Sequence, residues 1–251
     1  MNFIAKGLLG DFIHQMYAVK NLCEKHGEKA SIRITGNFAF GLERAYNDLL
    51  KLVICQDYVE AFTILYNPPK DAIDLDDRWR GYAYAHCPAG KYTYCWSEIM
   101  SKEFDFKIPE NNKWINATGE NKEVKNKILI NYGGSNPEFN KKLDKLIVEN
   151  PEDVLFITCN PLEYECSTYK DKIGVQFFRT ISDMADALAS CKYYIGYQSA
   201  PFALACALDI PRLVVLRDET HAGFYTGETK YSKNISYFLT NEKSFNTGFI
   251  G

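Results

Sequence analysis

Residues 191–216 read CKYYIGYQSAPFALACALDIPRLVVL, and this stretch predicts a strand, a tight turn, a helix and a second strand. Ser199 is a good helix N-cap, and Pro201 falls in the first helical turn, where its missing N–H costs no hydrogen bond. Residues 202–208 are apolar on nearly every side, so the helix should be buried rather than amphipathic. A β-branched run at residues 212–216 returns as the second strand.

The turn before this helix predicts an anion-binding site. A helix that follows a parallel strand points its N-terminal amides, and the positive end of its dipole, at the carboxyl edge of the sheet, where phosphate is the usual ligand. A plain crossover without a ligand is the alternative. The polar pair Gln198 and Ser199 favours a ligand, and together with Ala200 these residues form the first part of a predicted binding site.

A second turn of the same kind lies earlier in this half of the chain. Gly133, Gly134 and Ser135 separate an expected strand at residues 128–132 from an expected amphipathic helix at 137–149. Glycines let the backbone approach a ligand closely, and a serine hydroxyl donates a hydrogen bond. Two such turns at carboxyl edges of strands fit a pyrophosphate between them. The predicted site also takes in Asn131 at the end of the strand and Glu219 in the loop after residue 216, where Asp218 and His221 are alternatives.

The amino-terminal half shows a β-α-β-α-β rhythm, which predicts another parallel sheet. The expected elements are a strand at 3–5, a helix at 12–26, a strand at 30–35, a helix at 42–53 and a strand within 58–66. Gly7 and Gly10 lie in the turn after the first strand, but they do not form the Gly-x-Gly-x-x-Gly fingerprint, and no acidic residue closes the second strand. A nicotinamide or flavin cofactor is therefore not expected.

Two blocks of the sequence resemble heptosyltransferase-type glycosyltransferases with the B-type fold. That family opens with a strand, a Gly-x-Leu-Gly-Asp turn and a helix with an early histidine. Gly7, Leu9, Gly10, Asp11 and His14 match this pattern. Its second half contains an Ile-Gly-Asn-Gln-Ser-like turn, an alanine-rich helix and a Pro-Arg strand. Here the turn has Tyr197 in place of the asparagine.

The resemblance implies a fold class and roles for the site residues. The expected fold is α/β, with two Rossmann-like domains facing a cleft: an acceptor domain at 1–108, a polar linker at 109–127 and a nucleotide-sugar-binding domain at 128–251. In the family the turn aspartate is the proposed general base, so the resemblance assigns that role to Asp11, with His14 as a second cleft residue. A helix cap is the alternative role for Asp11.

Residues 67–91 are expected to form a long loop, which is dense in charge. Within it, Arg78 and Arg80 flank Trp79. Guanidinium groups bind oxyanions in a bidentate manner, and an indole ring stacks on sugars, so the two arginines are predicted to contact a glycan or phosphorylated acceptor. A solvated loop with Trp79 packed into the core is the alternative interpretation.

Composition narrows the classes of function. The net charge of −3 argues against nucleic-acid binding. The eight cysteines form no Cys-x-x-Cys pair, the amino terminus has no basic leader, and no apolar run approaches membrane-spanning length, so we expect reduced thiols and a cytoplasmic location without a transmembrane segment. No Asp-x-Asp pair is expected at a strand end, because the nearest candidates, Asp74, Asp76 and Asp77, are expected in the polar loop, and this predicts a reaction without a metal.

The sequence therefore predicts a metal-independent glycosyltransferase that moves a sugar from a nucleotide-diphosphate sugar to a hydroxyl of a glycan or glycoconjugate. The nucleotide sugar would be a co-substrate, and no further cofactor is expected. Two alternatives stay open. A non-catalytic nucleotide-sugar-binding module would bind the donor without turnover, and a nucleotide-sugar epimerase on the same double-Rossmann plan would convert the donor without an acceptor.

Overall fold

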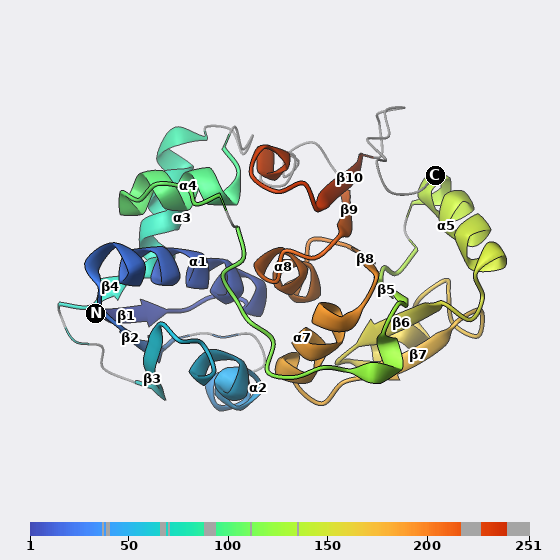
Figure 1. Cartoon of the computed structure of the whole chain (residues 1–251), viewed down its shortest axis with the longest axis horizontal. Coiled ribbons are helices and arrows are strands. Elements are labelled where there is room, and N and C mark those ends of the chain that lie inside the picture. Colours follow the sequence, from blue (N-terminus) through green and yellow to red (C-terminus); the bar gives the residue numbers. More distant parts are fainter. Residues whose placement is uncertain are drawn as a thin grey trace.

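The computed structural model describes residues 1–36, 38, 41–65, 69, 71–87, 94–110, 112–134, 136–216 and 227–239. Two parallel β-sheets lie side by side, one in each half of the chain, and helices pack on their faces (Figure 1). The architecture is α/β with two Rossmann-like halves, which confirms the predicted fold class.

The first sheet has the strand order β3-β2-β1-β4, and every pairing in it is parallel. Its strands are β1 (Asn2–Ala5), β2 (Ala30–Ile34), β3 (Val59–Ile64) and β4 (Ile73–Asp74), and its helices are α1 (Leu9–His26), α2 (Leu42–Ile54), α3 (Leu75–His86) and α4 (Trp96–Phe104). The strand order reverses at β1, because β2 and β4 lie on opposite sides of it. Ligands of open α/β sheets bind at such a switch point, outside the carboxyl ends of the strands.

The second sheet has the order β10-β9-β8-β5-β6-β7 and is also parallel. Its elements are β5 (Ile128–Asn131), α5 (Pro137–Glu149), β6 (Val154–Thr158), α6 (Pro161–Glu165), β7 (Gly174–Phe177), α7 (Ile181–Ser190), β8 (Tyr193–Gly196), α8 (Ala200–Ala207), β9 (Arg212–Leu216) and β10 (Ile235–Leu239). Counted from β5, this is the doubly wound order, with its switch point between β5 and β8. The register pairs Asn131 with Gly196, so the two turns that follow these strands leave the sheet side by side.

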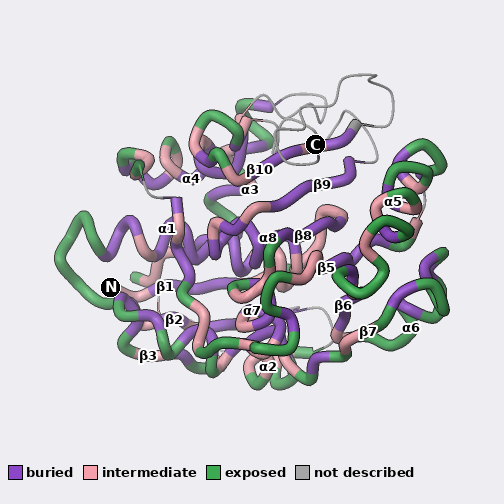
Figure 2. Tube along the Cα trace, turned by 45° about the vertical axis from the view of Figure 1, so that its right-hand side comes forward, coloured by how far each residue is buried: buried purple, intermediate pink, exposed green. Residues whose placement is uncertain are grey.

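Helix α8 lies at the centre of the molecule. Residues 202–207 are all buried, as their apolar composition predicted, and the neighbouring strands β8 and β9 are buried along their whole length (Figure 2). Helix α1 packs directly against α8, and one apolar cluster runs from the first sheet through these two helices to α7. A second cluster lies on the other side of the second sheet, under α5. The two halves therefore share a hydrophobic core.

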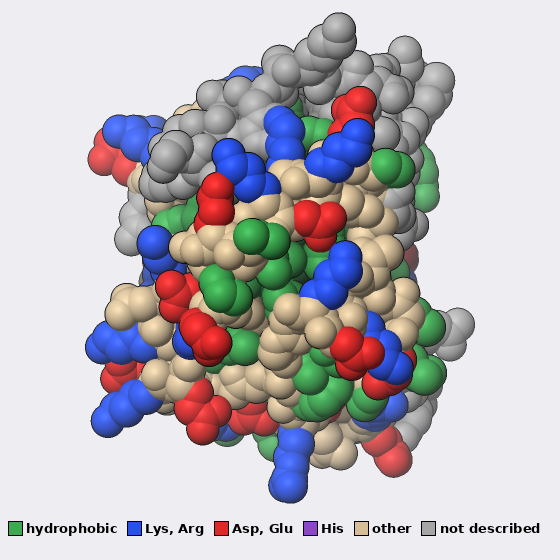
Figure 3. All heavy atoms as spheres, turned by 90° about the vertical axis from the view of Figure 1, so that its right-hand side faces the viewer, with side chains coloured by type: hydrophobic (Ala, Val, Ile, Leu, Met, Phe, Trp, Pro, Cys, Tyr) green, Lys and Arg blue, Asp and Glu red, His purple; other side chains and the backbone are tan. Residues whose placement is uncertain are grey.

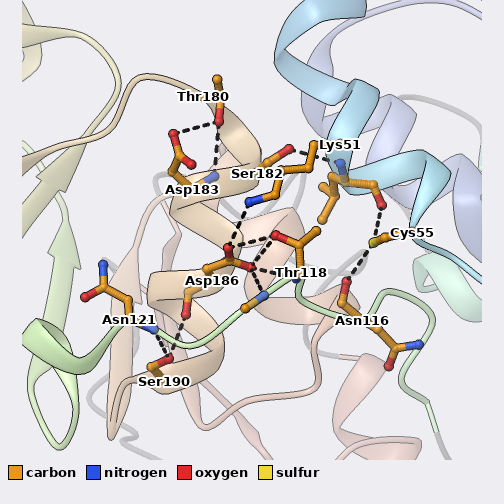
Figure 4. Close-up of polar contacts among 12 residues, drawn as sticks. Lys51, Cys55, Asn116, Thr118, Asn121, Thr180, Ser182, Asp183, Asp186 and Ser190 are labelled. Carbon is orange, nitrogen blue, oxygen red and sulfur yellow. Dashed lines mark hydrogen bonds and ion pairs between the residues drawn. The ribbon is translucent and has the colours of Figure 1, made fainter.

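The connection between the halves is held at several points. Trp114 and Ile115 are buried, and their amides donate to the Ala207 carbonyl at 3.0 and 3.1 Å. Further along, the Asp186 carboxylate on α7 accepts hydrogen bonds from the Thr118 amide and hydroxyl and from the Gly119 amide, at 2.7 to 2.9 Å for the shortest contact of each donor (Figure 4). The Trp114 indole also donates to the Ile13 carbonyl on α1 at 2.8 Å, so the predicted linker is fixed to both halves.

Helix α2 of the first half is also joined to α7. The amide of Leu52 donates to the Ser182 hydroxyl at 3.0 Å (Figure 4). The same hydroxyl lies 3.3 Å from the Asp48 carbonyl oxygen. After β9 the chain returns to the first half, where a short 3₁₀ helix, η3 (Gly227–Lys230), brings the buried Glu228 carboxylate to the start of α4. It accepts hydrogen bonds from the Ser97 amide at 2.7 Å and the Ser97 hydroxyl at 2.8 Å.

Three expectations about the elements were wrong. Helix α1 begins at Leu9 rather than at residue 12, because the Asp11 carboxylate accepts a hydrogen bond from the Leu8 amide at 3.3 Å and so stabilises an earlier first turn. The expected loop at residues 67–91 contains β4 and α3, so Asp74 and Asp76 lie at the end of a strand and in the first turn of a helix rather than in a loop. Helix α6 was not predicted. Residues 66–68, 70 and 88–93 of that region lie outside the described part of the chain.

Candidate functional site

Two neighbouring cavities lie between the carboxyl edges of the sheets. The larger, of about 420 Å³, is at the switch point of the second sheet, and Asn131, Tyr132, Gly133, Glu163 and Tyr197 contribute to its wall. The smaller, of about 260 Å³, lies between the turn after β1 and the start of α8, and Leu8, Gly10, Asp11, His14 and Trp96 contribute to it. Gln198 and Ser199 line both cavities. The predicted residues of the two halves therefore meet at one site.

Two helices begin at the smaller cavity. A Cβ atom on Gly10, in the first turn of α1, would lie 3.6 Å from both the amide nitrogen and the Cα atom of Ala200, the first residue of α8. Each helix terminus carries a partial positive charge from its unpaired amides. Two such termini side by side favour an anion at this position.

Ser199 occupies the N-cap position of α8, but its hydroxyl does not cap the helix. The hydroxyl is 3.5 Å from the Asn131 side-chain oxygen and 3.3 Å from the Tyr197 carbonyl oxygen, to which it can donate. The expected side-chain cap is therefore absent, and Ser199 links the turn after β8 to the end of β5 instead.

The two glycines after β5 have different surroundings. Gly134 adopts a φ of +87°, and a Cβ atom there would collide with the Thr168 side chain. Gly133 lines the larger cavity, and a Cβ atom at this position would meet no heavy atom within 4 Å. Gly134 is thus required by the local backbone, whereas Gly133 leaves room in the cavity. Ser135 and Glu219, both predicted to bind the same ligand, lie outside the described residues.

Glu163, in the first turn of α6, is a site residue that sequence reasoning missed. One oxygen of its carboxylate accepts hydrogen bonds from the Thr158 hydroxyl at 2.6 Å and from the Asn131 side-chain amide at 3.2 Å. The signal was present in the sequence: Asn160 followed by Pro161 is a helix start, and it places Glu163 in the first turn after a buried strand. The carboxylate is thereby fixed at the mouth of the larger cavity.

Asp11 lies at the first switch point in a network of charges. Its Oδ2 atom accepts from Arg80 Nη2 at 2.6 Å, and Arg80 Nε donates to both oxygens of Asp76, at 3.1 and 2.9 Å. Burial raises the pKa of Asp76 above the usual range of an aspartate, against the opposing effect of the Arg80 guanidinium. Arg80 is thus at the predicted site, but both carboxylates already bind it.

His14 contributes to the smaller cavity as a buried ring. It stacks on Trp96 with a centroid distance of 4.5 Å and an interplanar angle of 7°. Burial lowers the pKa of His14 to about 3, and the positive charge of Arg212 acts in the same direction. The imidazole is therefore neutral at neutral pH, and it is a weaker proton acceptor than an ordinary histidine.

Arg78 lies away from both cavities. Its Nε atom donates to Glu103 at 2.6 Å, and its guanidinium carbon is 4.6 Å from the centroid of the Phe104 ring, so it faces α4. The structure does not bring Arg78 to the other predicted site residues. Trp79, between the two arginines, is buried in the core of the first half, as the alternative interpretation had it.

Four further features of the described part of the chain bear on its chemistry. There, no cluster of three or more His, Cys, Asp or Glu residues is arranged to hold a metal ion. The described helices include none that is long and apolar enough to cross a membrane. All eight cysteines are free, as their spacing predicted. On the face shown in Figure 3, acidic and basic side chains alternate and no basic field gathers.

Solved structures with this arrangement are known. E. coli heptosyltransferase WaaC with ADP superposes with a TM-score of 0.60 at 14% identity, and the match covers 98% of this chain and 95% of that one. This is the heptosyltransferase fold. A glycosyl transferase family 9 protein from Veillonella parvula has a TM-score of 0.64 at 11% identity, with 95% and 85% of the two chains covered.

E. coli ADP-heptose lps heptosyltransferase II is a third neighbour with the heptosyltransferase fold. Its TM-score is 0.54 at 12% identity, and the match covers 94% of this chain and 89% of that one. No protein-family model matches the chain, and neither does any curated protein. The sequence resembles this family in two short blocks only, whereas the similarity of fold covers nearly the whole chain.

Proposed function

We propose that the protein is a glycosyltransferase that moves a sugar from a nucleotide-diphosphate sugar to a hydroxyl group of a glycan or glycoconjugate. The observation that carries this proposal is the meeting of Asp11 with the start of α8 in one cavity, which opens beside the larger cavity through the shared residues Gln198 and Ser199. A carboxylate that can act as a base and a site that favours a diphosphate are the two groups that sugar transfer needs.

The donor would lie across both cavities. Its diphosphate fits the paired helix termini of α1 and α8, where Gly10 meets Ala200. The ribose would lie at Glu163, because a fixed carboxylate accepts hydrogen bonds from two neighbouring hydroxyls, and the rings of Tyr132 and Tyr197, whose centroids are 4.6 Å apart, would contact the base. WaaC was solved with ADP and with ADP-2-deoxy-2-fluoro heptose, which supports a nucleotide sugar as the donor.

The chemistry needs one proton acceptor and one stabilised leaving group. Asp11 would take the proton of the acceptor hydroxyl as its oxygen forms a bond to the anomeric carbon. The bond from that carbon to the diphosphate oxygen breaks, and the nucleoside diphosphate leaves with the electron pair. The backbone amides and helix dipoles at the starts of α1 and α8 would stabilise the leaving charge, and we propose that they do so without a metal. Free thiols support a reducing compartment such as the cytoplasm.

Thermal unfolding with a panel of nucleotides tests this proposal. A nucleoside diphosphate that binds only the folded protein raises its melting temperature, and we expect this rise to persist in EDTA. The matching nucleotide sugar should then be turned over, to water or to an added glycan. Binding without any turnover would identify a binding module, and conversion of the donor sugar without release of nucleotide would identify an epimerase. Either result, or no stabilisation by any nucleotide, contradicts the proposal.

A further inference from the structure

We propose that Arg80 is a positioning residue for Asp11, and that the pair holds the base with one carboxylate oxygen anchored and the other free for the acceptor. This inference rests on the proposed function. It gives Arg80 a different role from the predicted acceptor contact, because its guanidinium is already shared between two carboxylates.

The two carboxylate oxygens of Asp11 differ in their hydrogen bonds. Oδ2 accepts from Arg80 Nη2 at 2.6 Å and from the Leu8 amide at 3.3 Å. Oδ1 accepts no hydrogen bond from any residue in the described part of the chain, although Asp11 lines the smaller cavity. A side chain anchored through one oxygen has its rotamer fixed, and its second oxygen stays available to an acceptor hydroxyl.

Arg80 is itself held in place by buried residues of the first half. Its Nε atom binds the Asp76 carboxylate, whose side chain is only 10% exposed, and Asp76 Oδ1 also accepts from the Gln15 side chain at 3.0 Å. Gln15 is fully buried and donates as well to the Lys6 carbonyl at the end of β1, at 3.1 Å. The guanidinium is therefore fixed to the first sheet rather than free to swing toward a substrate.

The turn after β1 is shaped around this network. Gly7 has a φ of +104°, and a Cβ atom there would lie 3.2 Å from Asp11 Oδ2, 3.2 Å from Asp76 Oδ1 and 3.4 Å from Arg80 Nη2. The absence of a side chain at position 7 lets the three charged groups come together. Only a planar fork reaches two carboxylates at once, since the single ammonium of a lysine presents one point of charge.

Four variants separate a positioning role from binding or from folding. They are Arg80→Gln, Arg80→Lys, Asp11→Asn and the double variant Asp11→Asn/Arg80→Gln, with Arg78→Gln as the control, because Arg78 lies on the same helix but pairs with Glu103. The probe is the member of a panel of UDP-, GDP- and ADP-sugars that the wild-type protein turns over, with water as acceptor where no glycan is accepted. Steady-state kcat and KM are measured for each variant, with the melting temperature as a check of folding.

We expect Arg80→Gln to lower kcat by roughly 10- to 100-fold, the scale for a misplaced catalytic group, with the donor KM nearly unchanged. Arg80→Lys keeps the charge, which guards against loss of folding, and should still lower kcat. In the Asp11→Asn background, Arg80→Gln should cause no further loss beyond about twofold, because no base is left to position. Arg78→Gln should behave as wild type.

Other outcomes overturn the inference. Additive losses in the double variant, or a rise in acceptor KM with unchanged kcat, would make Arg80 an independent binding group. A lower melting temperature with wild-type kcat would make it structural only. The two failures are separable: a wild-type protein without turnover removes the proposed function and this inference together, whereas wild-type turnover with additive effects removes this inference alone.

Discussion

Gly133 lies in the wall of the larger cavity, in a backbone conformation that an L-amino acid can adopt. A valine there would fill part of the space that the nucleotide is proposed to occupy, and its Cβ atom would meet no heavy atom within 4 Å. We therefore expect Gly133→Val to keep its melting temperature and to bind a nucleoside diphosphate at least about tenfold more weakly, about 1.4 kcal/mol. Isothermal titration calorimetry checks the affinity.

Gly134→Ala is the matched comparison. Its positive φ and the Thr168 side chain should make this variant less stable by about 1–3 kcal/mol, because both the backbone and the packing are strained. Unchanged nucleotide affinity in Gly133→Val would place the ligand elsewhere.

His14 predicts a pH dependence of stability. Its pKa is about 3 in the folded protein, against about 6.5 in an unfolded chain, so between these values the unfolded state binds more protons and stability rises with pH. Above pH 6.5 the contribution is constant. Between pH 8 and pH 5, His14 should therefore remove about 2 kcal/mol from the free energy of unfolding.

Urea denaturation of wild type and His14→Gln at several pH values measures this difference, and carboxylates common to both proteins cancel. The variant should lose about 2 kcal/mol less than wild type over the same interval. Parallel curves for the two proteins would show that the imidazole is protonated normally.

The sequence identified Asp11 through its turn, but its main partner was beyond reach of local patterns. Arg80 is 69 residues away, and the two meet because β4 pairs with β1 and starts α3 at the same sheet edge. A contact between residues so far apart in the chain cannot be predicted from local sequence patterns. For the same reason Arg80 was predicted as an acceptor contact, whereas the structure shows it between two carboxylates.

At the scale of elements, the strand, helix and strand from β8 to β9 could be predicted, although the side-chain cap expected of Ser199 is absent. The helix is apolar on every side, which predicts a buried helix, and residues 202–207 are buried. Gly196 ends β8, and Pro211 directly precedes β9. Helix α3 was missed because its charged residues suggest a solvated loop. Its signals were the N-cap Asp74, which accepts from the Asp77 amide at 3.0 Å, and acidic residues in the first turn.

Strand β4 and helix α6 are short, and short elements are set by their neighbours more than by their own sequence. Strand β4 has two residues, which pair with Phe3 and Ile4 of β1. Helix α6 has five residues, and all of them except Tyr164 are exposed, so no apolar period marks it. Missing α6 concealed Glu163 and its place in the wall of the larger cavity.

At the scale of the molecule, the two halves are joined by a common hydrophobic core and by hydrogen bonds to side chains of α7, among them Asp186. Asp186→Ala leaves three donors of the segment 118–119 without their acceptor, which should lower the free energy of unfolding by about 1–3 kcal/mol and speed amide exchange at Thr118 and Gly119. Urea denaturation and hydrogen exchange measure the two effects.

Lys51→Ala is the control for Asp186→Ala. Lys51 lies 3.6 Å from the same carboxylate, but its side chain is 61% exposed, so its removal should change stability by less than about 0.5 kcal/mol. Equal effects of the two substitutions would mean that surface charge, rather than the fixed linker, accounts for the stability.

The central claim is that the cleft between the two switch points binds a nucleotide sugar and that Asp11 acts on it as the base. Its most direct test is the turnover of the preferred nucleotide sugar by Asp11→Asn, measured beside nucleoside diphosphate affinity. Asparagine keeps an acceptor for the Leu8 amide but cannot take up a proton. The account predicts retained affinity with turnover reduced by about 10²- to 10⁴-fold. Turnover within a few-fold of wild type, with the nucleotide still bound, would contradict it.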